Sequence, residues 1–221
     1  YLVNCARIPG QYGLLLKLIF KLAYQSLQIR SHLCQFVGGI LSLTNSLRGV
    51  FGGLIARKLA SYNENLVPEK FFVAGMLHDI GQIVLCTKLP ELTLKILREI
   101  ESQPKPLHFA EIEELGFDHA ELGGRLLKKW NLSEFHVETT TFHHDPNRAP
   151  NFTLEASIVY LADILANTME LGSSGESTVP SIIDEETWRR LQLPDRISLS
   201  DLKAKIYKTY DETVSLFLQV A

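Results

Sequence analysis

The sequence has few cysteines and no excess of positive charge, and both absences exclude classes of protein. Three cysteines in 221 residues, widely spaced and without a CxxC pair, argue against a disulfide scaffold or a zinc ribbon. The three residues are Cys5, Cys34 and Cys86. Such cysteines are typical of reduced, buried thiols and so predict a cytoplasmic protein. The formal net charge of −3 gives no electrostatic basis for binding nucleic acid, which usually needs a basic face.

Long apolar runs are also missing. Residues 31–47 carry no formal charge, but they fall short of the roughly 18 apolar residues that a membrane span needs. We expect a buried helix there, and no membrane partner. The N-terminal residues lack a charged region followed by a cleavage site, so no secretory signal is expected. What the chain does have is an ordinary globular composition, 46% hydrophobic and 21% charged, which is enough to build a core.

Apolar residues recur at helical spacing and not at strand spacing, so we predict an all-α fold. The segment Glu69–Cys86 is apolar nearly all round, which is typical of a central, buried helix. Gly116 is placed to end a short helix, and Asp118 with Glu121 predicts a capped helix start directly after it. A clean amphipathic helix is expected over Thr153–Leu171, with apolar residues three or four apart.

Chemically capable residues gather around His78 and Asp79, which interrupt the predicted central helix. Buried charge is costly unless it is paired or bound to a metal, so this pair needs a partner. Two interpretations remain open: a hydrogen-bonded structural pair, or ligands of a metal ion completed by other helices. The other candidate ligands lie further along the chain: His119, His143, His144 and Asp163. Mixed imidazole and carboxylate ligands suit iron, manganese, zinc or nickel, and the sequence does not select among them.

These residues lie in segments that resemble a known family. The stretch FVAGMLHDIG, residues 72–81, resembles the central motif of the HD superfamily of metal-dependent phosphohydrolases. Three further segments resemble the HDOD domain, a bacterial signalling relative of those enzymes: GFDHAELG at 116–123, HHDP at 143–146 and LAD at 161–163. The resemblance implies a compact multi-helix HD-like bundle with additional N- and C-terminal helices. For the six candidate ligands it implies either no metal or a divalent transition metal, held in a working or a vestigial site.

The resemblance covers about Asn45 to Met169 and suggests three parts of the chain. We expect an HD-like helical core at 41–171. Residues 1–40 would be an N-terminal helical segment, and LVNCAR at 2–7 resembles a family segment that normally follows earlier helices, so this subdomain is expected to be incomplete. Residues 172–221 would form a flexible connection and C-terminal helices packed on the core.

Two positions depart from the pattern of the active hydrolases. Those enzymes carry a His upstream of the His–Asp pair, and Asn45 stands at that place here. An amide oxygen is a much poorer ligand for a transition metal than an imidazole nitrogen. In the cyclic-dinucleotide phosphodiesterase branch a Lys follows the Ile-Gly after the pair, and this chain has Gln82 instead. The resemblance therefore implies an incomplete ligand set and a missing phosphate contact.

We therefore favour a bacterial signal-transduction module that acts by protein interaction, with a degenerate metal site and no hydrolysis. Its partner would be a signalling protein or an attached regulatory domain. The alternative is a metal-dependent phosphohydrolase acting on a nucleotide or a cyclic dinucleotide, in which the metal activates a water and neutralises phosphate charge. A third possibility is binding of a nucleotide in the same pocket without hydrolysis.

Overall fold

A computed structural model describes residues 48–169, 185–191, 193, 202 and 204–209, and no β-strand occurs among these residues. The predicted all-α fold is confirmed. Residues 48–60 form the first described helix, and residues 202 and 204–209 are also helical. The elements between them are α3 (Pro68–Leu77), α4 (Ile80–Lys88), α5 (Pro90–Ser102), α6 (Leu107–Leu115), α7 (His119–Lys129), α8 (Glu134–Thr141), η2 (Pro146–Arg148), α9 (Thr153–Thr168) and α10 (Glu185–Leu191). The predictions for Cys5, Cys34, Asn45 and the segments 1–40 and 31–47 lie outside the described residues.

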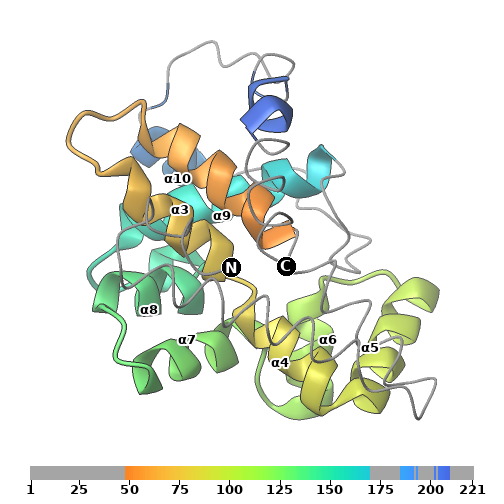
Figure 1. Cartoon of the computed structure of the whole chain (residues 1–221). Coiled ribbons are helices and arrows are strands. Elements are labelled where there is room, and N and C mark those ends of the chain that lie inside the picture. The colour runs from red at the N-terminus through yellow and green to blue at the C-terminus, as the bar shows by residue number, and fades with distance from the viewer. Residues whose placement is uncertain (1–47, 170–184, 192, 194–201, 203, 210–221) are drawn as a thin grey trace, which may run out of the picture.

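The helices form two groups, which Figure 1 separates clearly. The helix at 48–60 (orange), α3, α9 and α10 lie together and share the largest apolar core, to which Ile55, Phe71 and Val159 contribute. On the other side, α4, α5 and α6 pack in sequence. Helix α7 joins the two groups, because it packs against α8 on one side and against α4 on the other.

The predicted helix Glu69–Cys86 is in fact two helices, α3 and α4, separated at His78 and Asp79. Asp79 leaves helical geometry, with φ −96° and ψ 15°. Its backbone carbonyl still accepts the N–H groups of Gln82 at 3.0 Å and Ile83 at 3.4 Å, so α4 starts at once in a new direction. The break turns both functional side chains toward the interior of the molecule, where they are at most 3% exposed.

Two glycines allow the close helix contacts that position the site. A Cβ atom on Gly81 would lie 2.0 Å from the backbone oxygen of His119, so only glycine lets α4 approach the first turn of α7. A Cβ atom on Gly75 would lie 2.6 Å from the backbone oxygen of Gly52. Gly52 therefore lies where the helix at 48–60 closely approaches α3.

The helix boundaries around α7 follow the predicted chemistry. Gly116 ends α6 with φ +80°, the left-handed conformation that favours glycine. Asp118 accepts the N–H of Glu121 at 2.7 Å, which caps α7. Ser133 precedes α8, but its hydroxyl pairs with His136 Nδ1 at 2.9 Å and does not cap the helix.

Among the described residues, no single helix has the length and apolar character to cross a membrane. The segments Pro68–Lys88 and Pro90–Ser102 would together be long and apolar enough, but the chain bends by 114° between them.

Candidate functional site: a buried charge cluster

Asp79 and Asp163 are two buried carboxylates that share their cationic partners. Asp79 comes from the break between α3 and α4, and Asp163 lies on the buried face of α9. The Nε2 atom of His78 is 3.2 Å from Asp79 Oδ2 and 3.2 Å from Asp163 Oδ1. The other ring nitrogen of His78 donates to the backbone oxygen of Gly75 at 2.6 Å. The imidazole thus links the two carboxylates and is fixed at its far side by α3.

A second cation, Arg48, bridges the same two carboxylates. It comes from the helix at 48–60, and its Nη1 donates to Asp79 Oδ2 at 2.9 Å. Its Nη2 donates to Asp163 Oδ1. Arg48 is only 2% exposed. Charge-assisted bonds from a planar guanidinium to two acceptors fix its position more strongly than a single contact would.

Glu111 and His119 form a separate pair between α6 and α7. Glu111 Oε2 accepts the backbone N–H of His119 at 2.8 Å and its Nδ1–H at 2.6 Å. This arrangement leaves His119 Nε2 facing Asp79 Oδ1 at 3.3 Å. A carboxylate at the N-terminus of a helix is also favoured by the helix dipole. His119 is therefore held between two carboxylates.

Three more imidazoles complete the cluster on the other side of Asp79. His143 donates its Nδ1–H to the backbone oxygen of Thr140 at 2.7 Å, and its Nε2 is 3.7 Å from Asp79 Oδ1. His144 Nε2 lies 2.9 Å from His119 Nε2. His108, on α6, stacks on the ring of His144 with centroids 4.3 Å apart.

The electrostatics separate charged from neutral imidazoles. Burial opposes protonation of His78 and His119, but the carboxylates beside them outweigh it. The pKa of His78 rises to about 10, and the pKa of His119 lies well above its ordinary value. Burial and the neighbouring positive charge of His78 lower the pKa of His143 to about 3. Burial and the nearby imidazoles likewise hold the pKa of His144 well below its ordinary value.

The same partners keep both aspartates ionised. Burial alone would raise their pKa values, but His78 and Arg48 hold the pKa of Asp79 well below its ordinary value. Arg48 and His78 also lower the pKa of Asp163. Three cations (Arg48, His78 and His119) therefore stand against three carboxylates (Asp79, Asp163 and Glu111), and the cluster balances its own charge.

Two groups of side chains have donor atoms close enough to hold a metal ion. The first is His78, Asp79 and His143, and the second is His119, His143 and His144; within each group the donors lie within 4.8 Å of one another. The second group offers imidazoles alone and fits a single ion by donor type. The part of the cluster that contains Asp79 and Asp163, here called the carboxylate half, does not fit a divalent ion as it stands. The Arg48 guanidinium already occupies the space between these two side chains.

The structure brings all six predicted site residues into one cluster: His78, Asp79, His119, His143, His144 and Asp163. Gln82 is buried beside them and lines a small pocket there, together with Arg48, Leu107 and four of the six. Whether any of them binds a metal stays a prediction. The substitution at Asn45 lies outside the described residues.

Two residues of the cluster were not predicted, Arg48 and Glu111. Arg48 lies three residues after Asn45, so on a helix both would occupy the same face. Glu111 lies four residues after Leu107 on the buried face of α6, where a charge interrupts an apolar stripe. That placement was a readable signal for Glu111. His108 lies at the edge of the cluster, stacked on His144.

Comparison with known proteins supports the resemblance noted in the sequence. The model of the HDOD domain family matches residues 43–146. An uncharacterized protein of Treponema pallidum (strain Nichols) is 35% identical over 92 residues, which are 41% of this chain and 18% of that protein. The chain thus spans less than a fifth of the length of this relative.

Solved structures share the fold at low sequence identity. An HDOD domain protein of unknown function from Geobacter sulfurreducens matches with a TM-score of 0.64 and 22% identity, over 81% of this chain and 65% of that one. A putative signal transduction protein from Marinobacter aquaeolei VT8 matches with a TM-score of 0.66 and 16% identity, over 78% of this chain and 38% of that one. A putative phosphohydrolase from Shewanella amazonensis SB2B matches with a TM-score of 0.59 and 20% identity, over 93% of this chain and 82% of that one. Residues 43–146 of this chain are therefore similar to the HDOD domain family.

Proposed function

We propose that this domain is a bacterial signal-transduction module that acts by contact with another protein or an attached regulatory domain, and that it does not hydrolyse a phosphate ester. One observation carries the proposal: every carboxylate of the cluster is already paired with a cation of the chain itself. A hydrolase of the HD type would need two of them, Asp79 and Asp163, for its metal. Here they hold Arg48, His78 and His119.

Burial supports the same conclusion. His78, Asp79, His119, His143 and Asp163 are each at most 6% exposed. A phosphate ester would have to displace ion pairs to reach them, and buried ion pairs with good geometry are costly to break. Gln82 at the place of the phosphate-binding Lys removes a contact that the substrate would need. We also propose a cytoplasmic location, in keeping with the small number and wide spacing of the cysteines.

The test of non-catalysis is a phosphodiesterase assay with manganese or ferrous iron. The substrates are bis(p-nitrophenyl) phosphate and a cyclic dinucleotide, and the control is the His78→Ala, Asp79→Ala double variant. We expect the same background rate for both proteins. Turnover in the unaltered protein that disappears in the double variant would overturn the proposal.

The contact role is tested in the source bacterium. Deleting the coding sequence should change a signalling output, and the single variant His144→Ala should leave that output intact, because His144 is no member of the ion pairs that hold the cluster together. Loss of output in a folded His144→Ala protein would favour chemistry at the cluster over contact.

The alternative, a metal-dependent phosphohydrolase, is favoured by one observation. Two groups of donors lie close enough to hold an ion, and His143 belongs to both. Among the described residues, the buried Nε2 atom of His143 has no hydrogen-bond partner, which leaves it available as a ligand atom. The assay described above decides between the two functions.

A further inference from the structure

The guanidinium of Arg48 bridges Asp79 and Asp163, with one Nη atom on each carboxylate. The three residues come from three separate elements: the helix at 48–60, the break between α3 and α4, and α9. A divalent ion shared by the two carboxylates would hold the same elements in the same way. Arg48 thus supplies one positive charge at the point where a shared ion would bind.

The surrounding donors suit an ion at that point. His78 Nε2 lies 3.2 Å from an oxygen of each aspartate, and a donor of His143 lies within 4.8 Å of those of His78 and Asp79. Carboxylate and imidazole ligands suit manganese, iron, cobalt or zinc. A guanidinium and a divalent ion cannot share this place, because the two like charges would lie within a few ångströms of each other with little solvent between them.

We propose that Arg48 is a built-in substitute for a divalent cation, and that its removal converts His78, Asp79 and Asp163 into a metal site. This inference deepens the proposed function and rests on it, since it names the residue that keeps metal out of the carboxylate half. The imidazole group His119, His143 and His144 is independent of Arg48, because none of its three side chains is paired with the guanidinium.

The test is cobalt(II) binding by the whole chain, measured by calorimetry, by metal content after gel filtration and by the visible absorption of bound cobalt. The variants are Arg48→Ala and Arg48→Lys, and the matched control is Arg125→Ala, which removes an exposed arginine from its pair with Glu121. We expect Arg48→Ala to bind one more cobalt ion per chain than the unaltered protein. Arg48→Lys and Arg125→Ala should bind the same number as the unaltered protein.

The gained ion must depend on Asp163, so the double variant Arg48→Ala, Asp163→Asn should lose it. Equal cobalt binding by Arg48→Ala and the unaltered protein would overturn the inference. So would a cobalt ion in the unaltered protein that Asp163→Asn removes, because the carboxylates would then bind metal with Arg48 present. Neither result depends on turnover, whereas the proposed function fails only if turnover is found.

Arg48→Ala can fail to fold without an ion, and that outcome is also decisive. Circular dichroism and thermal unfolding are then measured with and without cobalt. Recovery of the helical spectrum with cobalt supports the inference, because the ion then replaces the guanidinium. A variant that stays unfolded at saturating cobalt overturns it.

Discussion

Glu111 accepts two hydrogen bonds from the same residue, His119, through a single carboxylate oxygen: the backbone N–H at 2.8 Å and the ring Nδ1–H at 2.6 Å. This pair fixes the start of α7 and the direction in which His119 Nε2 points. Because the ring is 2% exposed, loss of the carboxylate would leave a buried cation with Asp79 as its one anionic partner among the described residues.

We expect Glu111→Ala to lower the free energy of unfolding by about 3 kcal/mol, since removing one member of a buried charged pair leaves the other uncompensated. Urea denaturation of the two proteins measures the difference. Glu113→Ala, on the same helix, removes an exposed carboxylate that pairs with Lys105. Its effect should stay within about 0.5 kcal/mol. Equal losses of unfolding free energy in the two variants would show that the buried Glu111 contact stabilises the fold no more than the exposed Glu113 pair does.

Removal of Arg48 should be the most costly single change in the cluster. Arg48→Ala leaves Asp79 and Asp163 facing each other with His78 as their only shared cation, so we expect a loss of about 4 kcal/mol in the free energy of unfolding. Chemical denaturation in a metal-free buffer measures it. Arg125→Ala is the control and should lie within about 0.5 kcal/mol of the unaltered protein, because the side chain of Arg125 is 77% exposed.

Gly81→Ala should destabilise the protein by steric overlap, since its Cβ atom would lie 2.0 Å from the backbone oxygen of His119. We expect a loss of about 3 kcal/mol, together with shifted NMR signals from the His119 ring. Gly116→Ala is a useful contrast. It has φ +80° but nothing within 4 Å of the added carbon, so only the conformational cost of about 1 kcal/mol is expected. A smaller effect at Gly81 than at Gly116 would contradict the close packing of α4 on α7.

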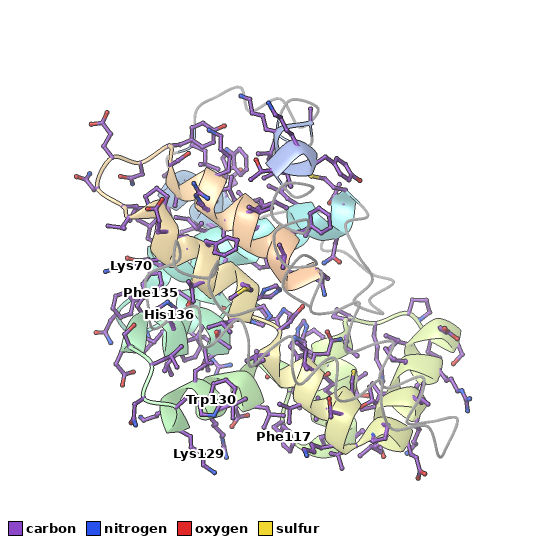
Figure 2. All side chains as sticks on the ribbon, in the orientation of Figure 1. Lys70, Phe117, Lys129, Trp130, Phe135 and His136 are labelled. Carbon is purple, nitrogen blue, oxygen red and sulfur yellow. The ribbon has the colours of Figure 1, made fainter. Side chains whose placement is uncertain are left out.

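His136 predicts a dependence of stability on pH that is separate from the cluster. Figure 2 shows His136 beside Phe135 and near Lys70, at the contact between α8 and α3. Burial, assisted by the positive charge of Lys70, lowers the pKa of His136 to about 4. Below pH 6.5 His136 is protonated in the unfolded chain, whereas in the folded protein it stays neutral down to about pH 4. Stability should therefore fall as the pH falls through this window and level off below it.

The expected loss from His136 is at most about 3 kcal/mol, the free-energy equivalent of the difference in pKa between the folded and unfolded states. The measurement is urea denaturation at a series of pH values between 7 and 4. His136→Gln is the control, because it cannot titrate. The variant should lose less stability across the window than the unaltered protein does. An equal loss of stability in the two proteins across this pH window would show that the titration of His136 is not its cause.

The sequence was sufficient for most of the helices and for six members of the cluster, and insufficient for Arg48, Glu111 and the pairing of the side chains. Helical spacing and cap residues such as Asp118 act over a few residues, so they can be read directly. The motif residues His78, His119 and Asp163 were recognised by resemblance, and they do lie together. The helix break at Asp79 was missed because apolar residues continue on both sides of it and only the tertiary contacts of the pair displace the backbone.

Arg48 was missed for a different physical reason. Its partners lie 31 and 115 residues further along the chain, and no local pattern reports a pairing over such distances. An arginine in a helix is usually read as a solvated side chain, because arginine is almost never fully buried unless it is paired. Two separate aspartates inside apolar helices already called for a partner, and the sequence left open whether a hydrogen-bonded side chain or a metal ion supplies it.

The positive charge that Asp79 and Asp163 require is carried by the polypeptide itself, so it arrives with the helix at 48–60 at the moment that helix docks. Pairing of these two carboxylates therefore requires no ion from the surrounding solution.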